Sequence, residues 1–571
     1  MSTTGIYGLS GSGIDVDSMV KVGMMTKQNQ YDKMYKEEVK NEWMKEAYAD
    51  LYSSVNTFNQ STLSTYKMSS TTSPMTATSS STSVASATAN ADAASMTHTV
   101  TVSSLASNAY LQTKDKITRG ESGSTSIYLK DILYSSSALA TQQATYDGMS
   151  DEEKQKTALE FTISDGAADD TNAVTKTISL TYEDIFGSNQ TLNDLATKIK
   201  NSGVNIQATY DSVNDSFSLY QKTGGKANQI RLLTSTDANG DTIDSDAATR
   251  AQKLLTNLNL AQVNTTTDSS GNTTQSLGTA LTFNSTTTDQ TAKGTDGSVT
   301  IDGKTYSTTS SKLTVNNVAY TFGATGTTTV TVAQDTDKLV ENVKQFVEDY
   351  NKMIDSLNSK YYETQYSDYG VLTKSQENGM TQEQITKWNE KAKSGLLYHD
   401  KQLGKIISSM REALYTPVEG IDSSYNTMMS LGISSSTDQG HIKLDETKLK
   451  KAIAADPSAV RNVFAASGDV TTTNDDGTTT TTTDYSKEGV MNRISDALYA
   501  NLKTLKSYAG DSSETSDGST LGTLIENLKT KMSDFKVQMT AYENLLYDKY
   551  DAMETAIQRL GVQMGYITGG N

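Results

Sequence analysis

Apolar residues near the end of the chain recur every three or four positions, as one face of a long helix requires. The stripe consists of Leu521, Leu524, Leu528, Met532, Phe535, Met539, Tyr542, Leu546, Tyr550, Met553, Ile557, Leu560 and Met564. A single helix over this range would be about 66 Å long. One compact domain cannot cover such a length, so we expect other helices to bury the stripe, either in this chain or in neighbouring subunits.

The opposite end of the chain repeats this spacing. A helix over about residues 40–66 is predicted by Met44, Ala47, Leu51, Val55 and Phe58. Residues 17–40 also have a helical pattern, but their apolar positions, including Met19, are sparse, which is typical of a segment that orders only when it is paired. We therefore predict that residues 1–40 and 520–571 form a helical or coiled-coil terminal region that is mobile when unassembled. Matching ends of this kind favour an assembly protein over an enzyme.

Between about residues 77 and 332 the period changes from 3.6 to 2, which predicts strands. The strand segments are 99–102, 161–163, 177–181, 216–220, 298–301, 312–315 and 328–332. A β-hairpin with Asp302-Gly303 at its tip is predicted over residues 299–306. Only residues 192–201 and 247–260 have a helical pattern here. The spacing predicts two β-rich domains, one inserted within the other.

The helical period returns at residue 336 and predicts helices over 381–393, 399–415, 444–455 and 489–507, with a solvated loop over 471–484. The fold class is α+β multidomain, with long N- and C-terminal helices in a coiled-coil or helix-bundle stem and two β-rich head domains inserted between them. The predicted domains are the terminal region 1–40 with 520–571, a helical bundle stem domain 41–76 with 333–519, an inner β domain 77–115 with 276–332, and an outer head domain 116–275.

Composition narrows the possible partners and compartments. The net charge is −18, which disfavours a nucleic-acid partner because phosphates would be repelled. There is no Cys, so disulfides and thiolate metal sites are excluded, and a cytosolic protein and an exported one fit equally well. The N-terminal residues lack the basic and apolar regions of a cleavable signal, and no apolar run is long enough to span a membrane.

The residues that could carry chemistry are dispersed. The three His residues, His98, His399 and His441, lie in separate segments without metal-ligand spacing. Residues 237–246 resemble a calcium loop but depart from the EF-hand pattern at Thr242 and Ala248, so an acidic surface turn is the better interpretation. There is no nucleotide-binding loop and no nucleophile elbow. We predict no catalytic residue, no cofactor and no metal ligand.

Several segments, taken in order, resemble the flagellar filament cap proteins of the flagellar hook-associated protein 2 family. They are residues 12–20 (SGIDVDSMV), 379–397 (GMTQEQITKWNEKAKSGLL), 411–420 (REALYTPVEG), 444–449 (LDETKL) and 550–556 (YDAMETA). The resemblance covers about residues 1–110 and 280–571. It departs from the family in the Met- and Tyr-rich first helix and in the loop 471–484.

The resemblance implies a homo-oligomeric ring, most often a pentamer, at the distal tip of the bacterial flagellum. There it would promote the folding and insertion of flagellin subunits. It further implies contact with the hook-filament junction proteins, export by the flagellar type III route and a cytoplasmic export chaperone, with no membrane insertion. The residues alone leave two alternatives open: a secreted adhesin, or a secreted carboxylate-based hydrolase with its site in the β head.

The helical stripes are the candidate contact surface with other subunits or the filament. Its predicted residues are Met19, Met44, Leu51, Val55, Phe58, Leu528, Met532, Phe535, Met539, Tyr542, Leu546, Tyr550, Met553, Ile557, Leu560 and Met564.

Overall fold

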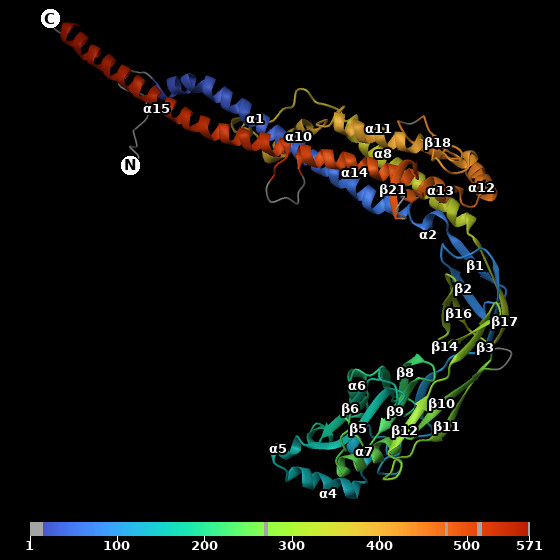
Figure 1. Cartoon of the computed structure of the whole chain (residues 1–571). Coiled ribbons are helices and arrows are strands. Elements are labelled where there is room, and N and C mark those ends of the chain that lie inside the picture. Colours follow the sequence, from blue (N-terminus) through green and yellow to red (C-terminus); the bar gives the residue numbers. More distant parts are fainter. Residues whose placement is uncertain (1–14, 268–271, 438, 474–477, 511–516, 569–571) are drawn as a thin grey trace. The chain divides into compact units, whose positions relative to one another are not determined.

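The computed structural model describes residues 15–267, 272–437, 439–473, 478–510 and 517–568. The chain forms two compact units, one of Met1–Pro74 with Thr336–Asn571 and one of Met75–Asp335. The first unit is mainly helical and contains both ends of the chain, whereas the second is mainly β (Figure 1). The α+β class with long terminal helices and inserted β-sheets is thereby confirmed.

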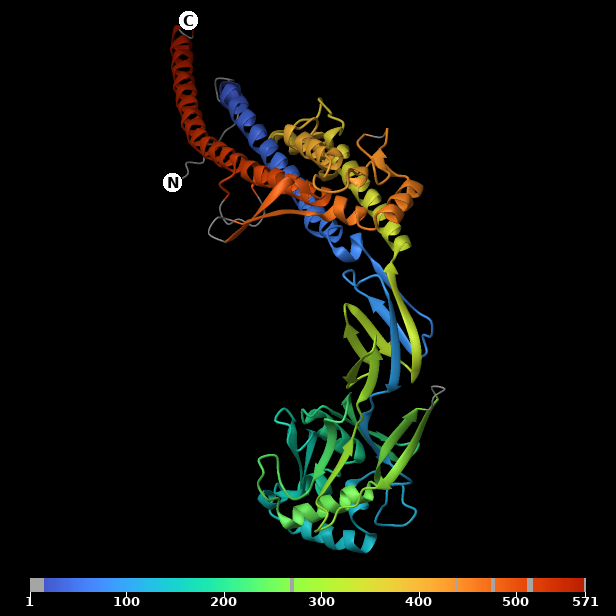
Figure 2. The same cartoon turned by 45° about the vertical axis from the view of Figure 1, so that its right-hand side comes forward.

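The helical unit contains two long terminal helices, α1 (Val16–Thr57) and α15 (Thr520–Thr568), which lie side by side in both views (Figures 1 and 2). A π-helical turn, Phe58–Leu63, directly continues α1. The remaining helices are α2 (Ser69–Thr72), α8 (Thr336–Tyr361), α9 (Lys374–Glu377), α10 (Gln382–Lys393), α11 (Lys401–Tyr415), a 3-10 turn (Ser423–Tyr425), α12 (Glu446–Ala455), α13 (Ala459–Ala465) and α14 (Val490–Ala509). Two short hairpins complete the unit: β18 (Ile433–Ser435) with β19 (Ile442–Leu444), and β20 (Ser467–Thr473) with β21 (Thr479–Glu488).

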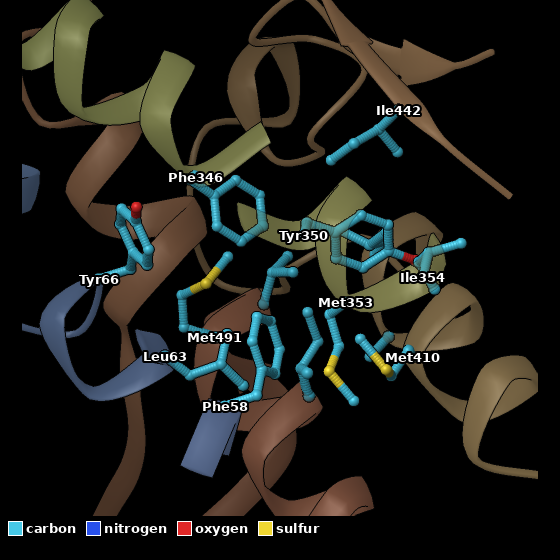
Figure 3. Packing of buried hydrophobic residues seen from close by; sticks show 14 of the residues in the cluster. Phe58, Leu63, Tyr66, Phe346, Tyr350, Met353, Ile354, Met410, Ile442 and Met491 are labelled. Atoms are coloured by element: carbon cyan, nitrogen blue, oxygen red, sulfur yellow. The ribbon is translucent and has the colours of Figure 1, made fainter. Parts of the chain in front are cut away.

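One hydrophobic core joins the inner end of α1 to α8, α11 and α14. Phe58, Phe346, Tyr350 and Met491 lie together in it, as Figure 3 shows. Helix α8 buries one residue in every three or four, so a whole face of the helix enters the core. Two tyrosines tie this core to polar groups at its edge, because the Tyr48 hydroxyl donates to Asp400 over 2.6 Å and the Tyr66 hydroxyl to Asp349 over 2.7 Å.

A charged residue, Arg493, is fully buried at the start of α14. Its Nη1 donates to the Pro417 carbonyl oxygen over 3.3 Å, and its guanidinium carbon lies 5.9 Å from the centre of the Tyr485 ring. Within the described residues, its Nε and Nη2 have no hydrogen-bond partner. Burial lowers the pKa of Arg493, so this side chain lies in an environment unfavourable to its charge.

Two predictions for the helical unit need correction. Helix α1 runs without a break from Val16, whereas a firm helix was expected only from about residue 40; α15 supplies the apolar contacts that its first half lacks in sequence. The predicted loop 471–484 is wrong where the structure describes its strands: residues 471–473 lie in β20 and residues 479–484 in β21, and the two strands pair. Their threonines have high β propensity, and no alternation marks the strands because most of their side chains are exposed.

Two large hydrophobic cores lie within the described residues of the β unit. The inner core lies between a five-stranded sheet, β1-β17-β3-β13-β14, and a three-stranded sheet, β15-β16-β2. These strands are β1 (Met75–Ser79), β2 (Ala85–Ala89), β3 (Thr97–Ser104), β13 (Gly297–Ile301), β14 (Lys304–Thr308), β15 (Lys312–Val315), β16 (Val318–Phe322) and β17 (Gly326–Gln334). The predicted hairpin is confirmed: β13 pairs with β14, and both Asp302 and Gly303 have positive φ, as a two-residue type I′ turn requires.

The outer core is bounded by a second five-stranded sheet, β11-β10-β4-β8-β7, and a four-stranded sheet, β12-β9-β5-β6. The strands are β4 (Asn108–Thr113), β5 (Thr157–Gly166), β6 (Thr175–Thr181), β7 (Ile206–Asp211), β8 (Ser216–Gly224), β9 (Asn228–Leu233), β10 (Leu260–Thr267), β11 (Thr273–Ala280) and β12 (Asp289–Lys293). The helical segments are α3 (Leu129–Leu133), α4 (Ser136–Asp147), α5 (Asp151–Lys154), a π-helical turn (Glu183–Gly187), α6 (Leu192–Asn201) and α7 (Ser245–Asn257).

An ion pair stabilises the outer core at one edge. The guanidinium of Arg119 donates through Nη1 and Nη2 to the two carboxylate oxygens of Asp215, over 2.7 and 2.6 Å. The hydrogen bonds from Arg119 hold the pKa of Asp215 below its usual range. This pair links the segment after β4 to the β7–β8 turn.

The two cores divide the β unit at residues other than the predicted 115/116 and 275/276. Strand β4 lies in the outer core, and the predicted boundary at 275 would cut through β11. The chain crosses between the cores near Ser107 and Thr295, which pair with each other, their hydroxyl oxygens being 2.8 Å apart. Helix α4 was not predicted because it has no apolar stripe and buries only Tyr146.

Candidate assembly interface: the pair of terminal helices

Helices α1 and α15 pack against each other in antiparallel directions. Near the start of α1, the Tyr547 hydroxyl donates to Asp17 over 3.0 Å. Six residues later, Gly23 lies against Leu546: a Cβ atom at position 23 would come within 2.7 Å of Leu546 Cδ1. The absence of a side chain at Gly23 therefore lets the buried Leu546 approach the α1 backbone.

Charged groups fix the alignment of the pair farther along α1. Lys529 Nζ lies 2.7 Å from Glu42 Oε1 and 3.4 Å from Glu38 Oε1. Burial raises the pKa of Glu38, whereas the hydrogen bond from Lys529 lowers the pKa of Glu42. One ammonium group thus serves two carboxylates, and a sliding of the helices would leave the buried Glu38 without its cation.

Two further contacts stabilise the interface between α1 and α15, which we call the seam. Lys45 forms an ion pair with Asp517, just before α15 begins. Near the other end, Lys27 Nζ lies 5.3 Å from the ring centre of Phe535 and 5.9 Å from that of Tyr542, within the range of a cation–π interaction. The seam is therefore partly polar along its length, rather than a continuous apolar core.

Helix α15 extends past its described partner. Tyr547 is opposite Asp17, and α1 begins at Val16, so the residues after about 550 have no described part of α1 beside them (Figure 2). Among them, Ile557, Leu560 and Met564 are exposed, with 37%, 59% and 64% of their surface accessible. The last turns of α15 thus present apolar side chains to solvent.

The structure separates the predicted contact residues into three groups. The residues buried within this chain are Leu51, Val55, Phe58, Leu528 and Leu546. The half-buried ones are Met19, Met44, Met532, Phe535, Met539, Tyr550 and Met553. The exposed ones are Tyr542, Ile557, Leu560 and Met564. Leu51, Val55 and Phe58 belong to the core of their own unit and leave almost no surface for a partner, while intermolecular contact by the exposed group stays a prediction.

Sequence reasoning missed the residues that align the two helices. Gly23, Glu38 and Lys529 were not singled out, although each carried a signal: a lone glycine inside a helix, and opposite charges on the faces that were expected to pair. Identifying them required the antiparallel register, which neither stripe contains by itself.

The other candidate groups have structural partners. His98 Nδ1 lies 2.6 Å from Asp302, and His441 Nε2 lies 2.6 Å from Asp355. In the turn 237–246, an Asp237 carboxylate oxygen accepts from the backbone N–H groups of Asn239 and Asp241. Within the described ranges no three His, Asp or Glu side chains are grouped so as to hold a metal ion, and no helix is long and apolar enough to span a membrane.

These features define a class of multidomain structural proteins in which both chain ends form one helical unit and a β-rich unit is inserted between them. The model of the flagellar hook-associated protein 2 N-terminus matches residues 12–109, and that of its C-terminus matches residues 294–561. The chain belongs to the flagellar hook-associated protein 2 family, which confirms the resemblance found in the sequence. Between the two matches lies nearly all of the outer core.

Individual relatives are distant. A flagellar hook-associated protein 2 of Halalkalibacterium halodurans is 30% identical over 263 residues, which are 44% of this chain and 49% of the relative. One of Thermotoga maritima is 27% identical over 44% of this chain and 38% of its own length. The chain thus spans half or less of these relatives. The crystal structure of the D1-D2-D3 domains of the Escherichia coli flagellar cap protein FliD, 18% identical, covers 84% of this chain and 99% of its own with a TM-score of 0.46.

Proposed function

We propose that this protein caps the flagellar filament, as an oligomeric ring at the distal tip that promotes the folding and insertion of flagellin. The observation that carries the proposal is that the family matches fall on both ends of the chain, the parts that form the α1–α15 pair. The relatives named flagellar hook-associated protein 2 support the same function. Neither an adhesin nor a hydrolase finds support in these relatives.

The helix pair supplies a physical reason for assembly. The exposed Ile557 and Leu560 of α15 would lose contact with water if another subunit covered them, and each buried aliphatic side chain contributes about 1.5–3 kcal/mol. Packing of such helices around an axis makes a closed ring, of which a pentamer is our preferred form. We further propose that the ends of the chain are mobile before assembly and become ordered in the ring.

Location and partners follow from this function. The assembled protein would lie outside the cell, in contact with flagellin and, during early assembly, with the hook-filament junction proteins. We propose export by the flagellar type III route, with a cytoplasmic chaperone on the exposed end of α15 beforehand. The absence of cysteine fits a chain that folds after export without oxidation.

A gene deletion tests the proposal directly. Cells without the gene should lack filaments and release monomeric flagellin into the medium, and the full chain supplied in trans should restore filaments. A chain ending after Tyr550 should fold and be exported but fail to restore them, while a chain with Val213→Ala, an exposed residue in the turn between β7 and β8, serves as the matched control. Normal filaments in the deletion strain would refute the proposed function.

A further inference from the structure

Helix α15 carries a second row of apolar residues on a different face from the stripe that packs against α1. The row, which we name the outer row of α15, consists of Val537, Ala541, Leu545, Ala552 and Ala556, spaced by four or seven residues. Val537 is 71% exposed and Leu545 is 58% exposed, whereas the neighbouring Leu546 is 7% exposed. The middle of α15 therefore has a buried face toward α1 and a bare apolar face elsewhere.

Helix α1 has a bare face of its own. The outer face of α1 consists of Ser18, Val22, Met25, Asn29 and Lys33, at helical spacing, and Val22 and Met25 are 67% and 58% exposed. Asn29 and Lys33 stay exposed at the edge of an open groove that Thr373 and Gln376 also line, whereas farther along α1 the chain covers this side itself, because Trp43 lies under Lys393 of α10. The bare stretch is thus the continuation of a face that is elsewhere a packing surface.

The two bare faces lie at the same level along the helix pair. Gly23 is in contact with Leu546, so Val22 and Leu545, which precede them on antiparallel helices, are level to within about 3 Å. Lys33 lies ten residues beyond Gly23, and Asp534 lies twelve residues before Leu546 on the antiparallel helix. With a rise of about 1.5 Å per residue, Lys33 and Asp534 are level to within about 3 Å.

The charges on these faces are complementary. Among the described residues, neither Lys33 nor Asp534 forms an ion pair, and both are exposed. Each face also carries its aliphatic residues on the same side as its charge. A surface with Val22, Met25 and a cation therefore matches, level by level, a surface with Leu545, Ala541 and an anion.

We propose that the outer face of α1 in one copy packs against the outer row of α15 in the next copy. This inference rests on the proposed ring and identifies its helical contact. A contact between two different faces is heterologous, and it closes into a ring only when repeated rotation brings equivalent residues to equal heights. The level match of Val22 with Leu545 and of Lys33 with Asp534 meets that condition for helices that run along the ring axis.

Engineered cysteines test the contact cleanly because the chain contains none. Full-length chains with Val22→Cys and with Leu545→Cys, each carrying a different tag, are mixed and oxidised at a concentration where the wild-type chain sediments as an oligomer. We expect a disulfide-linked dimer that contains both tags. Chains with Glu543→Cys, exposed and two residues away on another side of α15, are the matched control and should yield less than a tenth of that product when mixed with the Val22→Cys chain.

Charge exchange tests the same contact without disulfides. Lys33→Glu or Asp534→Lys alone should weaken self-association about fivefold, and the two together should restore it. Leu545→Asp should weaken it at least tenfold, because a buried aliphatic side chain is lost and a charge takes its place.

Three results would overturn the inference. The first is an oligomer without the Val22–Leu545 cross-link, or a chain that stays monomeric at all concentrations. The second is a cross-link of the Val22→Cys chain to itself, which would indicate a twofold contact. The third is a Leu545→Asp chain that self-associates normally but no longer binds purified flagellin filaments, which would assign the outer row to flagellin. In each case filament capping, measured by complementation, could still hold through another interface, so the two proposals fail separately.

Discussion

Adjacent leucines of α15 should have opposite roles in the single chain and in the assembly. Leu546 packs against Gly23 of α1, whereas Leu545 points away from the helix pair. We predict that Leu546→Ala weakens the attachment of α15 within one chain and that Leu545→Ala does not. The two substitutions remove the same atoms at neighbouring positions, so each is the control for the other.

The magnitude follows from burial. Leu546 is 7% exposed, so its replacement by Ala should cost about 2 kcal/mol of the free energy that holds α15 to α1. This corresponds to about a thirtyfold increase in the equilibrium constant for local opening. Leu545 is 58% exposed, and its replacement should change the same equilibrium by no more than about twofold.

Hydrogen exchange on dilute, monomeric protein measures this opening directly, because amides in α15 exchange when the helix detaches and unwinds. Amides of residues 535–550 should exchange about thirty times faster in the Leu546→Ala chain and at nearly the wild-type rate in the Leu545→Ala chain. Equal acceleration by both substitutions, or less than threefold acceleration by Leu546→Ala, would refute the packing of Leu546 against Gly23.

Four further predictions address other parts of the chain. Arg493→Met should leave the urea midpoint of unfolding of the helical unit unchanged or raise it, because the substitution removes a poorly partnered buried charge. Arg493→Ala should lower the free energy of unfolding by about 2 kcal/mol or more, because it leaves a cavity. Equal losses of stability in the two variants would contradict this. Because Arg119 depresses the pKa of Asp215 in the folded state, their contribution to stability is present in full above about pH 4 and is lost as the pH falls through the folded pKa. The thermal destabilisation by Asp215→Asn should therefore be larger at pH 7 than at pH 3 and should keep shrinking as the pH falls further. Lys529→Met should accelerate exchange in the first half of α15 at pH 7, and acidification to about pH 4 should reverse part of this, since burial already raises the pKa of Glu38, the buried carboxylate that would lose its cation. An effect independent of pH would argue against the charge alignment. Replacing residues 108–294 by a short Gly/Ser link should leave a folded inner β core that still caps filaments, and a folded, exported deletion chain unable to cap would show that the outer core takes part in assembly.

Elements with one apolar face could be predicted from the sequence, because periodicity records burial on a single side. The residue spacing that ends at Met564 predicted α15 within a few residues, and the Asp302-Gly303 pair predicted the β13–β14 turn. The β20–β21 hairpin and α4 were missed for the same physical reason: they expose most of their side chains, so no alternation or stripe marks them.

The sequence predicts that the terminal helices carry an apolar contact surface, but it does not predict which helix or subunit covers each part of that surface. A periodic stripe shows that a face is apolar, but it does not show which helix will cover it. Leu51 and Val55 are covered by their own unit, whereas Leu560 is not, and nothing in their spacing distinguishes them. The distinction depends on where α1 begins relative to α15, and that alignment is set by Gly23 and by the charges around Lys529.

The contact between Tyr547 and Asp17 also has a consequence for the order of folding. These residues are separated by 530 positions, so the helix pair closes a loop that contains almost the whole chain. The entropic cost of closing a loop grows only with the logarithm of its length. The contact therefore becomes favourable once folding of the chain between residues 17 and 547 has shortened the loop. The pair cannot form at all before the last helix is available, however fast the other parts fold. As the chain is synthesised or emerges from a channel in either direction, one helix of the pair must wait for the other, and closure of the pair requires that residues 17 to 547 are all available.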